Sequence, residues 1–344
     1  MNEFDGFFIG TMLIPLILVG MGWIFRKSHV YKGTSSWIKT FVWNGLIGLF
    51  LISVIFITGE AYYRFFVDTT DSFGLNKITK RWGDRHYQFN NYNWRDNIDY
   101  KLKKDTTRTR ITIIGDSFTA GHGLKNVDDR FANILRTKHP EFDIHVLASN
   151  GFESNNQWNS LLKSSAIGYE TDVVILIYNL NDIAWTLPET KTIYNRIFSF
   201  DSGLGYLAKE SYLLNMLAFR WFAMMDQNIK NYYHFVKDGY SGNSWAIQSE
   251  LLAKFVAHCR ANRIRLLVVT FPFLHNLENY EFAEAHFQLN EFWGNHQIPH
   301  LDLLDLYQQQ KDKEMVINSY DAHPNEQAHT YAAQWIEKFL LEHI

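Results

Sequence analysis

The residues whose types could carry out chemistry together are Ser117, Asp321 and His323. A serine hydroxyl can attack a carbonyl carbon when a histidine takes its proton, and a carboxylate can hold that histidine in the correct tautomer. In this set Ser117 is the expected nucleophile, His323 the general base and Asp321 the orienting group. The chemistry that these residue types predict is attack on an ester through an acyl-serine.

Ser117 stands just beyond the end of a predicted buried strand. Residues 111–114 form a run of β-branched side chains, and Gly115 and Asp116 follow at once. A short run of this kind, bounded by turn residues, favours a strand of a parallel sheet over a helix. We expect Gly115 to supply the backbone freedom for a tight turn, which places Ser117 at the carboxyl edge of the sheet, where ligands bind in such folds.

Asp321 and His323 stand immediately before Pro324. A proline disfavours the helical region for the residue before it, so His323 is expected in an extended segment. In an extended segment, residues two apart point to the same side. The side chains of Asp321 and His323 are therefore expected to lie side by side.

From residue 110 onward the predicted strands and helices alternate, as in a parallel sheet with helices on both faces. The predicted strands are 111–115, 143–147, 172–178, 263–271 and 299–303. The predicted crossover helices are 129–138, 155–165, 249–261 and 326–341. Right-handed crossovers would bring Ser117, Gly151 and Asn181 to one edge of the sheet, because each follows the end of a strand.

In four short blocks, taken in this order, the chain resembles the SGNH/GDSL hydrolase superfamily. The blocks are Gly115-Asp116-Ser117, the glycine Gly151, the run Asn179-Leu180-Asn181-Asp182, and the final set Asp321, His323 and Asn325. Two residues depart from the family pattern, since Phe118 replaces the commonest leucine and Asn179 stands where glycine is usual. The resemblance covers roughly residues 108–343.

The resemblance implies an α/β fold, namely a three-layer α/β/α (flavodoxin-like) domain with a five-stranded parallel sheet. It implies that the Ser117 and Gly151 amides and the Asn181 side chain hold the negative oxygen of the tetrahedral intermediate. One such donor lowers the barrier by about 3 to 4 kcal/mol. The implied catalytic set is completed by His323 and Asp321, and the resemblance implies no cofactor and no metal.

Two apolar runs without charges, 7–25 and 40–59, stand near the amino terminus. Each is long enough to cross a hydrocarbon core of about 30 Å at about 1.5 Å per residue. The alternative for the first run is a cleaved signal peptide, but its leader, MNEFDG, is acidic rather than basic, and the apolar run is longer than is usual in such peptides. We therefore expect two transmembrane helices.

The segment between these runs fixes the expected orientation. It carries Arg26, Lys27, Lys32 and Lys39 and no acidic residue. By the positive-inside rule this short loop stays in the cytoplasm. Everything after residue 59 is then expected on the other side of the cell (inner) membrane, which makes the catalytic domain extracytoplasmic, either periplasmic or extracellular.

The length of 344 residues and a hydrophobic content of 47% allow one sizeable core with additions. We expect an anchor at 1–59, a connecting segment at 60–107 and a hydrolase-like domain at 108–344. An aromatic-rich insertion is expected at about 184–245, with a helix around 212–230. We expect it to cover the carboxyl edge of the sheet as a lid or a substrate wall. The alternative is a helical excursion whose rings pack on the sheet or on the membrane surface.

Other polar residues are given structural interpretations. Asp116 and Asp182 are expected to brace their loops, and His122 and His329 are expected to be loop or surface residues. Arg95 is expected to pack, with contact to an anionic or polyol substrate as the alternative. The single cysteine allows no internal disulfide, and a net charge of -3 excludes a broad nucleic-acid surface.

The expected function is an extracytoplasmic serine esterase that acts on an ester, chiefly O-acetyl, of an envelope glycan or a lipid-like substrate. The alternative is an O-acyltransferase that modifies a polysaccharide, for which a membrane partner must supply the acyl group. Both reactions use the same triad. A third hypothesis is a catalytically silent glycan-binding or scaffold subunit.

Overall fold

The computed structural model describes residues 3–310 and 313–344, and the chain forms two compact units. The first consists of Met1–Thr69, Gly74–Asp84 and Phe198–Asp226, and we call it the helical unit. The second consists of Thr70–Phe73, Arg85–Ile197 and Gln227–Ile344, and we call it the sheet unit. Each unit is described in turn.

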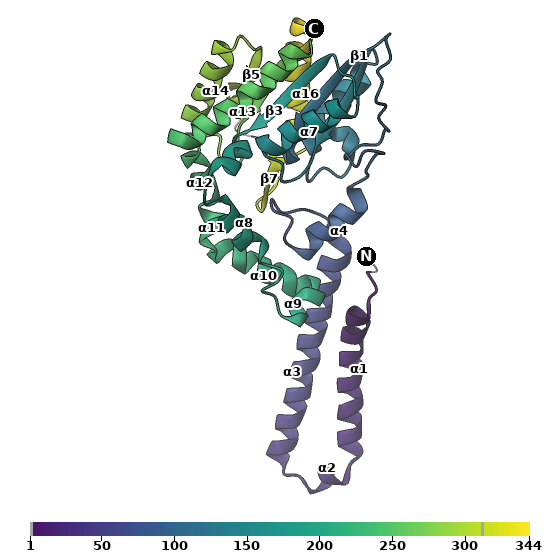
Figure 1. The fold of residues 1–344 in the computed structure, drawn as a ribbon. Coiled ribbons are helices and arrows are strands. Elements are labelled where there is room, and N and C mark those ends of the chain that lie inside the picture. Colours follow the sequence, from purple (N-terminus) through teal and green to yellow (C-terminus); the bar gives the residue numbers. More distant parts are fainter. Residues whose placement is uncertain (1–2, 311–312) are drawn as a thin grey trace. The chain divides into compact units, whose positions relative to one another are not determined.

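The sheet unit is built on one parallel sheet of five strands in the order β2-β1-β3-β4-β5 (Figure 1). The strands are β1 (Thr109–Gly115), β2 (Phe142–Ala148), β3 (Val173–Asn179), β4 (Arg265–Phe271) and β5 (His300–Asp302). This is the flavodoxin-like strand order, in which the direction of winding switches between β1 and β3. The predicted fold class is confirmed, and each predicted strand matches an observed one to within about two residues.

Helices cover both faces of this sheet. One core cluster joins β1 residues such as Ile111 and Ile113 to α6, α15 and α16, and a second joins β3 residues such as Val174 and Leu176 to α7, α13 and α14. These helices are α6 (Phe131–Lys138), α7 (Ser154–Ala166), α13 (Gly242–Ala261), α14 (Ala283–Asn295), α15 (Leu304–Gln308) and α16 (Glu326–His343). The shorter elements are α5 (Ser117–Ala120), η2 (Val127–Asp129), η3 (Leu180–Thr186), α8 (Thr190–Phe198), α11 (Gln227–Lys230), α12 (Tyr232–Asp238), β6 (Val316–Asn318) and β7 (Asp321–Pro324).

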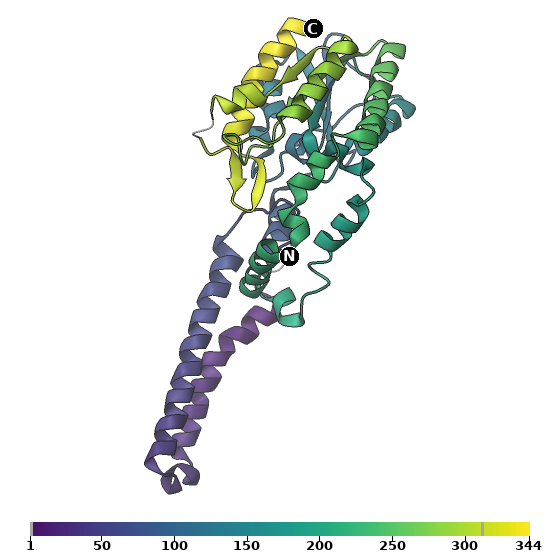
Figure 2. The same ribbon diagram turned by 90° about the vertical axis from the view of Figure 1, so that its left-hand side faces the viewer.

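The helical unit contains two long antiparallel helices, α1 and α3, which lie side by side (Figures 1 and 2). Its elements are α1 (Gly6–Lys27), α2 (His29–Gly33), α3 (Ser36–Ala61), η1 (Tyr62–Phe66), most of α4 (Lys77–His86), α9 (Tyr206–Glu210) and α10 (Tyr212–Met225). A Cβ at Gly22 of α1 would lie 2.9 Å from the Trp43 ring of α3, so the two helices approach closely there. Both apolar helices are long enough to cross a membrane.

A buried ionic network lies at the carboxyl end of α3. Glu60 and Arg64 are both fully buried, and Arg64 donates to Glu60 Oε1 at 3.0 and 2.8 Å. Arg64 also donates to Asp5 Oδ2 at 2.8 Å, so it links α3 to the residue that caps α1. Glu60 in turn accepts hydrogen bonds from Ser211 Oγ at 2.6 Å and Tyr212 N at 3.0 Å. These bonds tie α10 to the end of α3.

The aromatic-rich insertion is therefore divided between the two units. Residues 198–226, with α9 and α10, belong to the helical unit. The preceding residues with α8, and the following residues with α11 and α12, belong to the sheet unit. The helix expected around 212–230 is interrupted at Asp226, which is extended and separates α10 from α11.

Candidate active site

Ser117 lies at the carboxyl edge of the sheet, just beyond the end of β1. It begins α5, which Asp116 caps because Asp116 Oδ1 accepts a hydrogen bond from Phe118 N at 2.9 Å. A Cβ at Gly115 would overlap Thr119 Oγ1. Gly115 is therefore required for the close approach of α5 to β1. It does not have a positive φ, so the prediction that its backbone freedom makes the turn is wrong.

His323 connects Ser117 to Asp321. His323 Nε2 is 2.7 Å from Ser117 Oγ, and His323 Nδ1 is 2.5 Å from Asp321 Oδ1. All three residues are buried. The segment of Asp321–Pro324 is the extended strand β7, so the two side chains share one side of the backbone as expected. The structure thus brings together the hydroxyl, the imidazole and the carboxylate that were expected to act as nucleophile, base and orienting group.

Besides His323, side chains of the segment 70–73 contact Asp321 and the residue after it. Thr70 Oγ1 donates to Asp321 Oδ2, and Ala322 N donates to Ser72 Oγ at 2.9 Å. Burial acts to raise the pKa of Asp321, but the charge and the hydrogen bond of His323 hold it below its ordinary value. Burial acts to lower the pKa of His323, but the charge and the hydrogen bond of Asp321 raise it above its ordinary value. The pair is therefore arranged to stabilise an imidazolium next to Ser117.

The expected oxyanion donors follow the strands on either side of β1. Gly151 follows β2 and Asn181 lies in η3 after β3, and both strands pair with β1. Gly151 is exposed, and its φ of 72° lies in the left-handed region, which by itself favours glycine. Asn181 is half-buried, and its Oδ1 atom makes no hydrogen bond within the described residues. The topology thus places Ser117, Gly151 and Asn181 at one edge, as expected, while their roles remain proposals.

Asn179 joins the turn that carries Ser117 to the turn that carries Asn181. Asn179 Nδ2 donates to Asp116 Oδ2 at 3.2 Å, and Asn179 N donates to Asp182 Oδ2 at 3.1 Å. Burial raises the pKa of Asp116 to about 6 and raises the pKa of Asp182 well above its ordinary value. The two acids make loop-bracing contacts, and the asparagine side chain adds a bond that the usual glycine could not make.

A model of the GDSL-like Lipase/Acylhydrolase family matches residues 113–331. The match runs from β1 into α16 and includes Ser117, Asp321 and His323. The chain belongs to this family. It is therefore an acylhydrolase that acts on ester bonds, as the sequence resemblance implied.

Several solved structures are similar to this acylhydrolase at low identity. A member of the lipolytic protein G-D-S-L family from Veillonella parvula DSM 2008 is 14% identical, with a TM-score of 0.39 over 67% of this chain and 97% of the other. TesA is 11% identical, with a TM-score of 0.44 over 69% and 100% of the two chains. A two-domain esterase (CEX) active on acetylated mannans is 16% identical, with a TM-score of 0.37 over 68% and 49%. No curated protein matches the chain in sequence.

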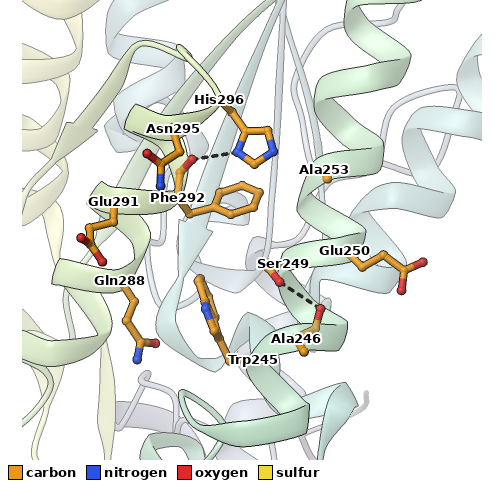
Figure 3. Close-up of a pocket in the computed structure, with 10 residues that line it drawn as sticks. All are labelled: Trp245, Ala246, Ser249, Glu250, Ala253, Gln288, Glu291, Phe292, Asn295 and His296. Atoms are coloured by element: carbon orange, nitrogen blue, oxygen red, sulfur yellow. Dashed lines mark hydrogen bonds between the residues drawn. The ribbon is translucent and has the colours of Figure 1, made fainter.

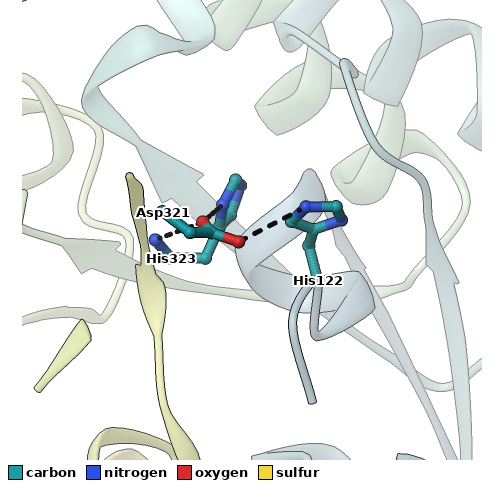
Figure 4. Close-up of side chains that lie close together, drawn as sticks. All are labelled: His122, Asp321 and His323. Atoms are coloured by element: carbon teal, nitrogen blue, oxygen red, sulfur yellow. Dashed lines mark hydrogen bonds and ion pairs between the residues drawn. The ribbon is translucent and has the colours of Figure 1, made fainter. Parts of the chain in front are cut away.

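His122 of this acylhydrolase lies beside Asp321, across from the triad histidine (Figure 4). His122 Nε2 is 3.1 Å from Asp71 O and 3.5 Å from Asp321 Oδ2, and His122 Nδ1 is 2.9 Å from Asn150 Nδ2. Because an amide nitrogen only donates, Nδ1 accepts, and the ring proton lies on Nε2. His122 lies in the turn after α5, as expected of a loop residue, but it is buried, so the prediction of a surface position is wrong. Its contact with Asp321 of β7 is not visible from sequence spacing.

His122 is neutral in this arrangement. Burial and the neighbouring charge of His323 lower the pKa of His122 to about 4. His122, Asp321 and His323 offer donor atoms within 4.8 Å of one another, which is a spacing that a metal ion could bridge. The two His323 nitrogens, however, face Ser117 and Asp321, and the His122 Nε2 proton faces Asp71 O. The donor set is thus arranged for proton transfer rather than for coordination.

Phe118, in place of the commonest leucine, packs edge-on against the catalytic ring. Its ring centroid is 5.3 Å from that of His323 and 6.1 Å from that of Phe271 at the end of β4. Edge-to-face contacts of this kind fix the relative orientation of two rings. The substitution therefore supports the position of His323 and does not disturb it.

Arg95 and His329 both have structural environments. Arg95 is buried and donates to Ala120 O at 3.2 Å and also to Gly121 O and Leu124 O, so it supports the turn after α5. This is the packing role, and contact of Arg95 with substrate is not supported. His329 is fully buried, and burial lowers its pKa to about 3, so the prediction that it lies in a loop or at the surface is wrong.

Part of the insertion stands beside Asn181. Tyr232 of α12 lies near Asn181, and burial raises the pKa of Tyr232 to about 12. The Tyr232 ring packs edge-on against Phe73 at 5.2 Å, and Tyr194 OH of α8 donates to Glu153 Oε1 at 3.1 Å. These aromatic residues form a wall next to a proposed oxyanion donor. Tyr194 and Tyr232 belong to the predicted aromatic-rich insertion, whereas Phe73 comes from the segment before the sheet.

A groove between α13 and α14 contains none of the candidate catalytic residues (Figure 3). The residues that line it are Trp245, Ala246, Ser249, Glu250, Ala253, Gln288, Glu291, Phe292, Asn295 and His296. Ser249 Oγ donates to Ala246 O at 2.9 Å, and His296 Nδ1 donates to Phe292 O at 2.9 Å. Serine and histidine in this groove are therefore engaged with their own helices, and the groove offers no activated nucleophile.

Proposed function

We propose that this acylhydrolase removes acyl groups, chiefly O-acetyl, from an envelope glycan at the outer side of the membrane in which α1 and α3 anchor it. The observation that carries the catalytic part is the continuous contact from Ser117 Oγ through His323 to Asp321, at 2.7 and 2.5 Å. A glycan that is assembled at the membrane is the substrate that suits an anchored esterase.

In the first half of the proposed reaction, Ser117 Oγ bonds to the ester carbonyl carbon while His323 Nε2 takes the hydroxyl proton. The Ser117 and Gly151 amides and the Asn181 side chain hold the resulting oxyanion. Collapse of the tetrahedral intermediate breaks the bond between the carbonyl carbon and the alcohol oxygen. The imidazolium of His323, stabilised by Asp321, gives its proton to the departing sugar oxygen.

In the second half, water attacks the acyl-serine. His323 takes a proton from the water, and the second tetrahedral intermediate expels Ser117 Oγ, to which the histidine returns the proton. The products are the free carboxylic acid and the regenerated serine. If a sugar hydroxyl attacks in place of water, the same steps transfer the acyl group, which is the transferase alternative and requires a membrane partner as acyl donor.

The anchoring part of the proposal rests on α1 and α3. Side chains along both helices are largely exposed, for example Leu16 at 67% and Ile55 at 71%, which suits a lipid environment. The basic loop between them, with Arg26 and Lys27 in the last turn of α1, favours the cytoplasm. A reporter active only in the cytoplasm, fused after Ile344, should be silent, and its activity would overturn the orientation.

The catalytic part is tested on the full chain in lipid nanodiscs with p-nitrophenyl acetate, followed by mass spectrometry of the protein. We expect an acetyl group on Ser117, no adduct in Ser117→Ala, and rapid release into water. An acetyl-enzyme that persists in water but discharges onto glycan oligomers would establish the transferase. If neither protein gives an adduct or turnover, the silent scaffold subunit is favoured instead.

A further inference from the structure

One face of α10 in the helical unit is exposed and largely apolar. Its exposed apolar side chains are Leu217, Trp221, Met224 and Met225, with exposed fractions of 50% to 63%. Trp221 follows Leu217 by four residues, and Met224 and Met225 follow Trp221 by three and four, so these side chains form one stripe along the helix. The charged residue next to this stripe is Arg220, whose guanidinium lies 5.8 Å from the Tyr63 ring centroid.

The opposite face of α10 is buried within the helical unit. Tyr212, Met216 and Phe219 are each at most 5% exposed. The helix therefore has one side packed in protein and one side for which the described residues provide no cover. An exposed stripe that holds a tryptophan and two methionines is costly in water and marks a contact surface.

The start of α10 is fixed to the last turn of α3. Glu60 Oε2 accepts from Ser211 Oγ at 2.6 Å and from Leu213 N at 2.9 Å, and Glu60 Oε1 accepts from Tyr212 N at 3.0 Å. A Cβ at Gly59 would lie 3.0 Å from Leu213 Cδ2, so the backbone of α3 is in close contact with α10. Figure 1 shows α9 and α10 beside this end of α3.

The short helix α9 is fixed at the same place. Lys77 Nζ donates to Lys209 O at 2.9 Å and to Glu210 O at 3.0 Å, at the end of α9. On α9, Tyr206 is 71% exposed and Leu207 is 59% exposed. Two large exposed side chains on α9 thus stand directly before α10 in the sequence.

The charge pattern of α3 indicates the level of the membrane at which α10 begins. The helix carries no charge from Thr40 to Gly59, and its first charged residues beyond that run are Glu60 and, in η1, Arg64. In a spanning helix, such a change marks the level at which the hydrocarbon ends. Because Glu60 binds the start of α10, α10 begins at that level, where tryptophan and basic side chains are enriched and where amphipathic helices bury one face by about 5 to 10 Å.

We infer that the exposed stripe of α10, together with Tyr206 and Leu207, lies in the lipid headgroup region of the membrane. The inference rests on the membrane anchoring under the proposed function. Its consequence is that the acylhydrolase touches the bilayer at a second place in its sequence, because residues 198–226 interrupt the sheet unit between β3 and β4. The lipid surface, rather than a second copy of the chain, is favoured because the start of the helix that carries the stripe is hydrogen-bonded to the end of a candidate span.

The test uses the full chain with Cys259→Ala, reconstituted in vesicles of brominated phosphatidylcholine and labelled with bimane at single cysteines. Met224→Cys and Leu217→Cys report the stripe. Ile52→Cys, on the 64% exposed middle of α3, reports the span. Glu250→Cys, on the exposed surface of α13, is the control in water. We expect bromine to quench the labels at residues 217, 224 and 52 and to leave the label at residue 250 bright.

The other quenching patterns distinguish failure of the lipid contact from failure of the membrane anchoring. Quenching at residue 52 without quenching at residues 217 and 224 would leave the anchor intact and refute the lipid contact. If the two stripe labels are then also shielded from iodide in water, a protein surface or a second copy covers the stripe. If residue 52 is not quenched, the membrane anchoring itself fails, and the lipid contact fails with it.

Discussion

Two buried carboxylates, Glu60 in the helical unit and Asp321 in the sheet unit, are used in opposite ways. Both are fully buried. Glu60 accepts from the Arg64 guanidinium, from Ser211 Oγ and from two amides at the start of α10, so both of its oxygens meet fixed donors. Asp321 instead accepts from His323, whose other nitrogen ends at the hydroxyl of Ser117.

The difference lies in where each chain of hydrogen bonds ends. The partners of Glu60 are backbone amides, a hydroxyl and a guanidinium that stays charged. Proton transfer among these groups is therefore not expected. The series of hydrogen bonds from Asp321 ends at the Ser117 hydroxyl, which under the proposed function becomes a nucleophile once its proton moves to His323. A buried carboxylate whose partners are all fixed donors, such as Glu60, holds elements of the fold together. A buried carboxylate whose hydrogen bonds lead to a hydroxyl, such as Asp321, can take part in catalysis, and we call the series from Asp321 to Ser117 the reactive end.

The largest expected effect is on the reactive end. Ser117→Ala and His323→Ala should each lower kcat by at least about 10³-fold, because the nucleophile or its base is lost. Steady-state hydrolysis of p-nitrophenyl acetate measures this, with circular dichroism to verify the fold. Ser249→Ala, which removes a half-buried serine in the groove of α13 and α14, should leave kcat unchanged. Equal activity of Ser117→Ala and the wild type would refute the assignment of Ser117 as the nucleophile.

Removing the carboxylate of Glu60, which holds the helical unit together, should lower stability rather than kcat. Glu60→Ala leaves the start of α10 and Arg64 without their acceptor, and removing one partner of a buried pair costs about 3 to 5 kcal/mol. Thermal unfolding in nanodiscs should show a lowered midpoint, with kcat preserved at temperatures where the variant is folded. Asp201→Ala breaks the exposed pair with Lys80, in which 54% of the Asp201 side chain is accessible, and should cost less than about 1 kcal/mol. Equal losses in both variants would erase the distinction.

Asn181 tests whether the reactive end includes an oxyanion donor. Asn181→Ala should lower kcat by about 10²- to 10³-fold with little change in KM, because the bond is made in the transition state. Asn179→Gly restores the usual family residue and removes only the bond to Asp116, so it should cost about 1 kcal/mol of stability without that loss in kcat. A loss in kcat for Asn179→Gly as large as that for Asn181→Ala would show that both act through loop position.

The sequence alone predicted the sheet and the triad for physical reasons that act locally. Buried parallel strands are short apolar runs, so all five were visible, and Pro324 predicted the extended segment that pairs Asp321 with His323. The predicted helix 249–261 begins later than the observed α13, which begins at Gly242, because residues 242–247 include no buried residue that would mark an apolar face. No helix is predicted at α14, where the buried face includes the polar residue His286.

What could not be predicted depends on contacts between distant segments. Nothing near His122 in the sequence indicates that it meets Asp321, since that contact joins the turn after α5 to β7. Likewise, Glu60 looks like the polar end of a span until Ser211 and Tyr212, from the middle of the insertion, are seen to bind it. Local patterns show which residues are buried, but only the fold shows which buried residues are partners.

The smallest expected effect concerns the pH dependence of the reactive end. Because His323 must be unprotonated to act as a base and its pKa is raised above the ordinary value of 6.5, kcat/KM should rise as pH increases through a midpoint above 6.5. The negative charge of Asp116 is one cause of that rise. Asp116→Asn keeps an acceptor for Phe118 N but removes the charge, so the midpoint should move down by less than about one unit.

Asp182 supplies the matched control for this shift. Burial raises the pKa of Asp182 well above its ordinary value, which favours its neutral carboxyl, and the charges that raise the pKa of His323 are those of Asp321, Asp116 and Asp71. The midpoint of kcat/KM for Asp182→Asn should therefore stay where it is in the wild type. An equal downward shift in both variants would mean that the charge of Asp116 is not what distinguishes these two buried acids in their effect on His323.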